Sequence, residues 1–325
     1  SIGESAMKVH TTGARNIAIG AEAMDDTNAG STSLASEDNT FIGYRAGSGT
    51  WADAASNGNI GIGNYTMDAA MNGALGNVSL GHYAVSSLTT GDYNIGIGQN
   101  AGLSITTGEK NITIGRQAGD TMTATSNTIL IGFEAGQAIN STGANGTVAI
   151  GHQAGYAITS GAGNLAIGYQ ALLTHTTGGD NIAIGSGAIG DTNAGSTSLG
   201  SVQNIAIGTG TLGGAWADAA SNYNIGIGKF VMDAVMNGAD HNIGIGQYSL
   251  SALTEGDDNT AIGYNALGSL TTGNFNIGIG DRAGVSVTTG TNNIHLGYLA
   301  GYGGNTTGNV AIGSEALLSC AASSN

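Results

Sequence analysis

The side chains of this sequence that could do acid–base chemistry are few and scattered. The six histidines stand at positions 10, 82, 152, 175, 241 and 295. His82 and His152 share one position of the repeat described below, but several coils lie between them, so we expect no pair to meet. A Gly-x-Gly-x-x-Gly motif leading into a helix, which would bind a nucleotide, is absent from the sequence. We therefore predict that the chain is not an enzyme.

Calcium is the metal ion that the sequence makes worth considering. The net charge is −15, and several aspartates stand in predicted turns; they are Asp25, Asp26, Asp191, Asp257 and Asp258. Calcium prefers oxygen ligands, yet the nonapeptide motif of calcium-binding β-rolls is missing. We expect no cofactor, with calcium as a minor alternative. A single cysteine, Cys320, allows neither an internal disulfide nor a zinc cluster.

Aromatic side chains are the candidates for surface binding. The two tryptophans, Trp51 and Trp216, fall in longer, bulged coils, where an exposed indole would stack on a sugar or a partner protein. The alternative is that each tryptophan folds back and covers its bulge. Tyr44 and Tyr264 directly follow a repeated glycine and are expected to be exposed. They would make carbohydrate contacts or, alternatively, stack in a ladder of rings.

All these residues belong to a repeat that runs from end to end. A glycine closes a short apolar run eighteen times, at positions 3, 20, 43, 63, 81, 98, 115, 132, 151, 168, 185, 208, 228, 246, 263, 280, 297 and 313. The commonest interval is 17 residues, and a period of this length indicates stacked coils. We predict an all-β parallel β-solenoid of about 18 coils, a single continuous domain over residues 1–325.

Each repeat begins with a predicted strand. The residue before the glycine is Ile or Leu, and the residue two places earlier is usually apolar, as in Ile17 and Ile19 before Gly20. Apolar residues at alternate positions predict a strand of about five residues, and we expect them to be buried against identical neighbours. The position between them, such as Ala18 or Gly61, is mostly small and should face the opposite way. A small residue there would admit another subunit or leave a flat surface in solvent.

Asparagine stands four residues before the glycine in 15 of 17 coils, and the exceptions are Thr128 and Thr147. Stacked asparagines can hydrogen-bond from coil to coil, as amide ladders do in cross-β structures. The glycine is expected to turn the chain at a corner, in a backbone conformation that other residues avoid. The predicted ladder and corner positions include Asn16, Asn59, Asn94, Asn111, Asn181, Asn224, Asn276, Gly20, Gly98, Gly115, Gly185 and Gly280.

The two halves of the chain are copies at an offset of 165 residues. The glycine spacings that start at Gly20 recur from Gly185, and DTNAGSTSL at 26–34 recurs at 191–199. MDAAMNGA at 67–74 likewise returns as MDAVMNGA at 232–239. We interpret residues 1–165 and 166–325 as an internal duplication.

Composition narrows the range of partners. Seven Lys and Arg against 22 Asp and Glu argue against nucleic acid. No run approaches the ~20 apolar residues that a membrane-spanning helix needs, so we expect no membrane insertion. The sequence has 59 glycines and no proline, which fits a backbone whose N–H groups are nearly all used in ladders.

The repeat resembles the head repeats of trimeric autotransporter adhesins and the repeats of bacterial and phage tail-fibre-like proteins. The segments that carry the resemblance are AIGYQALLTHTTGGDNIAIG (166–185) and AIGYNALGSLTTGNFNIGIG (261–280). It implies a homotrimer in an extracellular fibre, on a cell-surface appendage or a virion. From the repeat we expect a structural rod subunit, adhesive and self-associating as a trimer or head to tail. The alternatives are a receptor- or glycan-binding module of a phage tail fibre and, more distantly, an ice-binding solenoid.

Overall fold

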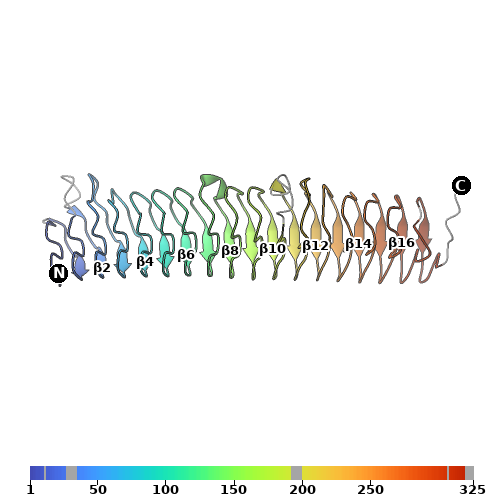
Figure 1. The fold of residues 1–325 in the computed structure, drawn as a ribbon, viewed down its shortest axis with the longest axis horizontal. Helices are drawn as coiled ribbons and strands as arrows, with labels where there is room; N and C mark the ends of the chain where they lie inside the picture. The colour runs from blue at the N-terminus through green and yellow to red at the C-terminus, as the bar shows by residue number, and fades with distance from the viewer. Residues whose placement is uncertain (11, 27–34, 192–199, 306, 319–325) are drawn as a thin grey trace. The chain divides into compact units, whose positions relative to one another are not determined.

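The computed structural model describes residues 1–10, 12–26, 35–191, 200–305 and 307–318. The protein is an all-β parallel solenoid with essentially no helix, as the repeat predicts. The chain forms two compact units, Ser1–Gly163 and Asn164–Asn325. Within each unit the strand of one coil lies beside the strand of the next (Figure 1).

Among the described residues, seventeen strands of three residues each form the solenoid. The first unit holds β1 (Ile17–Ile19), β2 (Thr40–Ile42), β3 (Ile60–Ile62), β4 (Val78–Leu80), β5 (Ile95–Ile97), β6 (Ile112–Ile114), β7 (Ile129–Ile131), the short 3-10 turn η2 (Thr142–Ala144) and β8 (Val148–Ile150). The second unit holds β9 (Leu165–Ile167), β10 (Ile182–Ile184), β11 (Ile205–Ile207), β12 (Ile225–Ile227), β13 (Ile243–Ile245), β14 (Thr260–Ile262), β15 (Ile277–Ile279), β16 (Ile294–Leu296) and β17 (Val310–Ile312). Ile2 adds an isolated parallel bridge to Ile19.

The strands are shorter than the alternation predicts, because the N–H of the ladder asparagine does not donate to a backbone carbonyl of the next coil. The backbone N–H of Asn39 donates to the side-chain Oδ1 of Asn16 at 3.0 Å. The backbone N–H of Asn94 donates in the same way to Oδ1 of Asn77 at 2.8 Å. At these strand starts a side-chain oxygen thus takes the place of a carbonyl as acceptor, and the corner glycine ends the strand on the other side.

Neighbouring strands are parallel and in phase. Ile17 of β1 pairs with Thr40 of β2, Ala18 with Phe41, and Ile19 with Ile42. In the following pairs of strands, too, the first, second and third residues of one strand pair with the first, second and third residues of the next. Each strand position therefore forms its own column along a unit.

The corner glycines adopt the conformation that the sequence predicts. Their φ angles lie between +119° and +143°, including those of Gly20, Gly98, Gly115, Gly185 and Gly280. At Gly115 an added Cβ would lie 2.3 Å from the carbonyl oxygen of Gly132 in the next coil. The corner thus excludes any side chain, both by backbone conformation and by the close approach of the next coil.

The interior of each coil is narrow. The middle residue of the strand and the small residue three places after the corner glycine are buried in it, as Ala18 and Ala23 are, together with larger side chains such as Met24. Phe41, the middle residue of β2, is fully buried there. It fits because the next coil has Gly61 at the same level, where a Cβ would lie only 2.6 Å from the Phe41 ring.

Candidate interaction surface

The apolar residues of the strands face outward, and the small residues between them face the core. Ala18 is fully buried, whereas Ile17 and Ile19 on either side of it are 48% and 36% exposed. The sequence predicts buried isoleucines and small residues on the outer face, and both predictions are wrong. The interior already holds the ladder amides and large side chains from outside the strands, such as Met67 and Leu88, so the two isoleucines of each strand remain outside.

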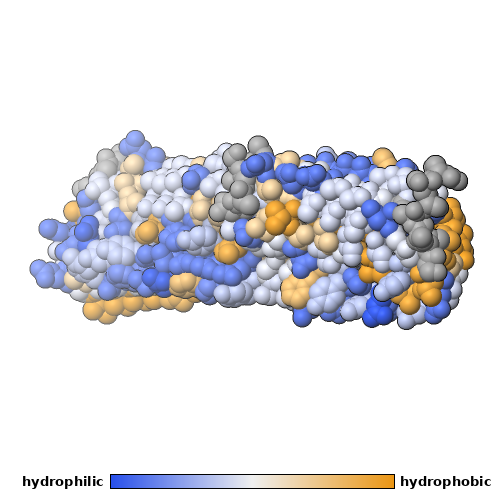
Figure 2. Space-filling model, turned by 45° about the vertical axis from the view of Figure 1, so that its right-hand side comes forward, coloured by the Kyte–Doolittle hydropathy of each residue, from blue (hydrophilic) through white to orange (hydrophobic). Residues whose placement is uncertain are grey.

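The outward strand residues form two apolar columns in each unit, which we call the isoleucine face. The face consists of the first and third residues of β1–β17, and only Thr40 and Thr260 among these 34 positions are polar. Figure 2 shows apolar side chains gathered in bands on the surface beside hydrophilic stretches. Monomeric soluble proteins rarely expose contiguous apolar patches larger than a few hundred Å². This row of exposed apolar side chains is therefore the candidate interaction surface.

The asparagine ladder is confirmed within each unit. Nδ2 of Asn94 donates to Oδ1 of Asn77 at 3.1 Å and to the carbonyl of Gly108 at 2.8 Å. Oδ1 of Asn94 in turn accepts from Nδ2 of Asn111 at 3.0 Å. At the exceptional position Thr128, the hydroxyl donates to Oδ1 of Asn111 at 2.8 Å and so continues the ladder. The other predicted members make the same side-chain contacts: Asn16, Asn59, Asn181, Asn224 and Asn276.

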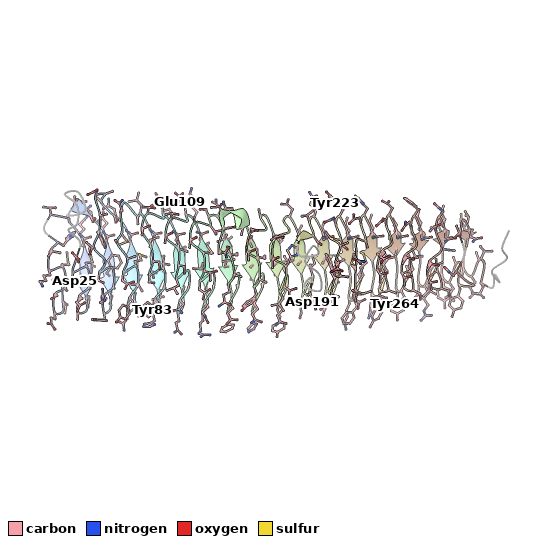
Figure 3. The ribbon with its side chains drawn as sticks, turned by 45° about the horizontal axis from the view of Figure 1, so that its top comes forward. Asp25, Tyr83, Glu109, Asp191, Tyr223 and Tyr264 are labelled. Carbon is pink, nitrogen blue, oxygen red and sulfur yellow. The ribbon has the colours of Figure 1, made fainter. Side chains whose placement is uncertain are left out.

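Two rows of side chains border the isoleucine face. The entry flank is the residue before each ladder position: Arg15, Asp38, Gly58, Gly76, Tyr93, Lys110, Asn127, Gly146, Gly163, Asp180, Gln203, Tyr223, His241, Asp258, Phe275, Asn292 and Gly308. The exit flank is the pair of residues after each corner glycine, from Ala21 and Glu22 to Ser314 and Glu315. Figure 3 shows Tyr223 of the entry flank on one edge and Tyr83 and Tyr264 of the exit flank on the opposite edge, with the strands between them.

The sequence reasoning missed the entry flank. Every residue in it has a positive φ, for example +57° at Arg15 and +56° at Tyr93. Gly58 and Gly76 stand in the same row with φ of +67° and +64°. The recurrence of glycine at this position is the signal that could have found the row, because glycine favours the left-handed conformation.

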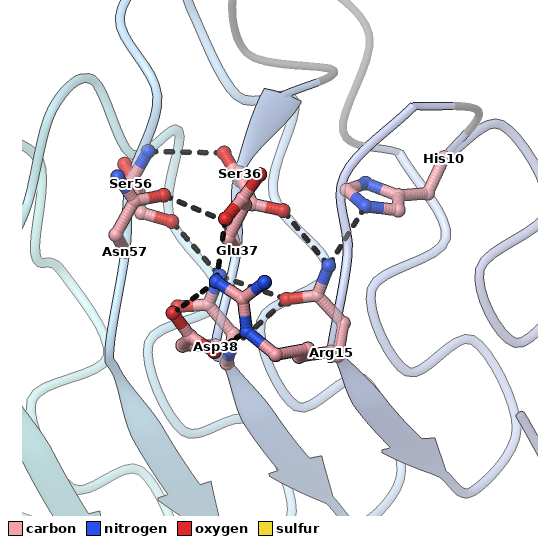
Figure 4. A network of polar contacts seen from close by, with 9 residues as sticks. His10, Arg15, Ser36, Glu37, Asp38, Ser56 and Asn57 are labelled. Atoms are coloured by element: carbon pink, nitrogen blue, oxygen red, sulfur yellow. Dashed lines mark hydrogen bonds and ion pairs between the residues drawn. The ribbon is translucent and has the colours of Figure 1, made fainter.

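Charged side chains on the two flanks pair from coil to coil. On the entry flank, Nε of Arg15 lies 2.5 Å from Oδ1 of Asp38, and Nη2 lies 2.6 Å from Oε2 of Glu37 (Figure 4). The hydrogen bond from Arg15 lowers the pKa of Asp38. On the exit flank, Nε of Arg45 lies 3.6 Å from Oε2 of Glu22. From β1 to β2 the charge therefore changes from positive to negative on the entry flank, and from negative to positive on the exit flank.

Tyr44 and Tyr264 of the exit flank are exposed, as predicted, whereas Tyr65 and Tyr83 are half-buried, and the rings also contact one another. Tyr44 and Tyr264 are 39% and 41% exposed. The Tyr44 ring meets that of Tyr65 edge to face at 5.3 Å, and Tyr65 stacks on Tyr83 at 4.7 Å. In the second unit the Arg282 guanidinium lies 5.7 Å from the centroid of the Tyr264 ring. The rings thus form short ladders with one side in solvent.

The prediction of surface binding at the tryptophans is wrong. Trp51 and Trp216 are both fully buried. The Trp51 ring meets Phe41 edge to face at 6.0 Å, and its backbone N–H donates to the carbonyl of Asp26. The alternative holds, that each indole folds back inside its longer coil. The repeated segments 27–34 and 192–199 beside these coils lie outside the described residues.

The histidines lie in different surroundings. His82 is exposed on the exit flank, whereas His175 and His295 are buried. Burial lowers the pKa of His295, and within the described residues neither of its ring nitrogens has a hydrogen-bond partner. Burial also lowers the pKa of His175, to about 4. A buried ring held neutral is typical of a structural histidine.

In the part of the chain that the structure describes, no three side chains of His, Cys, Asp or Glu are placed to hold a metal ion. Of the aspartates considered for calcium, Asp257 accepts the backbone N–H of Asp240 through Oδ1 at 2.8 Å. Asp26 accepts the hydroxyl of Thr50 at 2.5 Å. Both carboxylates therefore connect successive coils. Cys320 lies outside the described residues.

None of the described helical segments is long and apolar enough to cross a membrane. Comparison with known proteins finds no match to a family model, to a curated protein or to a solved structure.

Proposed function

We propose that the protein is a structural rod subunit of an extracellular fibre whose copies associate through the isoleucine face. The observation that supports this proposal is the outward orientation of both apolar columns over eight strands in the first unit and nine in the second. A solenoid that needed these side chains only for its own core would turn them inward. Here the core is complete without them.

The size of the face suits a second copy of the chain. At ~4.8 Å between strands and ~3.3 Å per residue, it measures ~10 Å by ~38 Å on the first unit and ~10 Å by ~43 Å on the second. Together these surfaces offer roughly 800 Å² per copy, which is the share that one partner contributes to a standard stable interface. A second copy brings a face of the same dimensions and the same apolar character. The net charge of −15 keeps assembled rods soluble.

Analytical ultracentrifugation of the purified chain tests this proposal. We expect the wild type to sediment as a dimer, a trimer or a longer polymer. A variant with Ile95, Ile97, Ile112 and Ile114 changed to Thr should dissociate at the same concentration, because the change removes apolar surface but keeps β-branched side chains. Val235→Thr, at an exposed site outside the strands, is the control. A monodisperse wild-type monomer at high concentration would contradict the proposal.

The second candidate function is a receptor- or glycan-binding module, and the exposed exit-flank tyrosines are the observation in its favour. Their rings present apolar faces in solvent, which is the geometry that sugars stack on. The buried tryptophans give it no support. Saturable oligosaccharide binding that falls when Tyr44 and Tyr264 become Ala, with assembly unchanged, would favour this function over a purely mechanical one.

A further inference from the structure

We infer that the flanks of the isoleucine face fix how two copies meet: parallel, in register, with the entry flank of one copy beside the exit flank of the next at the same coil. This inference rests on the proposed association through the face. It adds the direction and the register of the contact and the residues that set them.

The geometry of facing sheets brings these flanks together. When two parallel copies turn the same face toward each other around an axis that runs along the coils, their strands cross the interface in opposite directions. The start of each strand then lies opposite the end of the partner strand on the same level. In an antiparallel arrangement, entry flank would lie beside entry flank, and exit flank beside exit flank. The two arrangements therefore pair different side chains.

Charges on the first two strands favour the parallel, in-register contact. At the level of β1, Arg15 on the entry flank faces Glu22 of the second copy; at β2, Asp38 faces Arg45. Glu37, which lies beside Asp38, adds a second carboxylate to the β2 level. A slip by one coil places Arg15 opposite Arg45 and Asp38 opposite Glu22, so both contacts become repulsive. Like charges that meet across an interface cost several kcal/mol.

Side-chain size is also matched between the flanks. Gly58 on the entry flank of β3 leaves space, because an added Cβ there would meet nothing nearer than the backbone of Gly76 at 4.0 Å. The exit flank of the same coil carries Tyr65. The Tyr65 ring of one copy therefore meets bare backbone of the other.

The second unit matches rings with cations. Tyr223 and Phe275, 47% and 56% exposed on the entry flank, stand level with Lys229 and Arg282 on the exit flank. A cation over an exposed ring is attracted by the ring quadrupole. In the first unit, the coil of β6 brings two positive side chains together, because Lys110 of one copy lies opposite Arg116 of the other. Glu109 lies 3.6 Å from Lys110 in the same chain and offsets its charge.

Charge-swap variants test the charged contacts without changing the composition of the chain. The exit swap, Glu22→Arg with Arg45→Glu, keeps an oppositely charged pair within the chain but reverses it toward a partner. The entry swap, Arg15→Asp with Asp38→Arg, does the same on the other flank. Each swap should raise the dissociation constant of the assembly about tenfold at low salt, and much less at ~1 M salt, where screening is strong. Combining both swaps should restore wild-type association, because the four charges again match.

Thiol crosslinking then reads the register directly in the second unit. In a Cys320→Ser background, Asp180→Cys and Ser186→Cys place thiols on the entry and exit flanks of the β10 coil. Within one chain they are separated by ~20 Å of extended backbone, so a short bismaleimide should join them only between copies. The matched control pairs Asp180→Cys with Gln247→Cys, three coils and ~14 Å further along, and should not crosslink.

The outcomes separate this inference from the proposed function. Restored association in the doubly swapped protein and a crosslink at the same coil alone would support it. Assembly that is insensitive to either swap, or a crosslink only in the offset pair, would overturn the inference and leave association through the isoleucine face standing. A wild-type monomer would remove the proposed function and this inference together.

Discussion

His175 is expected to make the second unit less stable as the pH falls below 6.5, its ordinary pKa. The imidazole is fully buried, with Nε2 at 3.0 Å from the carbonyl oxygen of Gly178 and 3.2 Å from Nδ2 of Asn181. Burial lowers its pKa to about 4, and the hydrogen bond to Gly178 opposes this only in part. The folded unit thus holds the neutral ring, whereas the unfolded chain binds a proton at a higher pH.

The sign and size of the effect follow from these two pKa values. Between pH 6.5 and about 4 the unfolded chain carries a proton that the folded unit does not, so the free energy of unfolding falls through this window and levels off below it. The values differ by 2.5 (6.5 − 4), and at about 1.4 kcal/mol per pKa unit the loss is about 3 kcal/mol. This is a large fraction of the stability of a typical domain.

Urea unfolding at about pH 7.5 and about pH 4 measures this loss, because the urea midpoint reports stability. In a Trp51→Phe background the fluorescence of Trp216 reports on the unit that contains His175. His175→Gln should lose about 3 kcal/mol less than the parent over this interval, whereas His82→Gln, at an exposed histidine, should behave like the parent. If His175→Gln loses as much stability as the parent, the buried neutral ring is not the cause.

Two further predictions concern the ladder and the corner. Asn94→Ala should lower the free energy of unfolding by about 3 kcal/mol, since it leaves buried donors and acceptors of the adjacent coils unpaired. Asn94→Thr should cost less, because Thr128 continues the ladder natively; equal losses in urea unfolding would argue against the ladder. Gly115→Ala should cost about 3 kcal/mol or more. Gly146→Ala, with a φ of +77° but nothing within 4 Å of the added Cβ, should cost about 1 kcal/mol; similar melting temperatures for the two would show that the close approach is unimportant.

The coil and its ladder could be predicted because each depends on a residue type that returns at one position. An asparagine once per coil has few uses other than pairing with its copies, and a glycine once per coil marks a backbone that no other residue adopts. The orientation of the strand could not be read in this way. Alternation shows that Ile17 and Ile19 share a face and that Ala18 takes the other, but it does not say which face the core occupies.

The orientation did leave a trace in the sequence, in the volume of the middle residues. Phe41 is followed one coil later by Gly61, and the structure places the two in contact inside the coil. Compensation of this kind is expected in a closed interior and not on an open surface. The tryptophans lacked a comparable trace. Each tryptophan stands in a coil whose extra length is unique within its half, so no adjacent coil has an equivalent position whose residue type could indicate burial.

The backbone shows why the stack, and not the single coil, must be the stable unit. Among the described residues, 39 that are not glycine have positive φ, and each such residue costs ~1–2 kcal/mol. A coil has only three strand residues to set against this cost, and it offers its own amides few partners, such as the carbonyl of Gly115 for the N–H of Ala118. Stacking supplies both, because Asn94 and the backbone around it bond to the coils on either side. Stability therefore grows with the number of neighbours, as in other repeat proteins. The core of each coil is complete without the first and third strand residues, so the outer face can carry the apolar side chains that the proposed contact with a second copy requires.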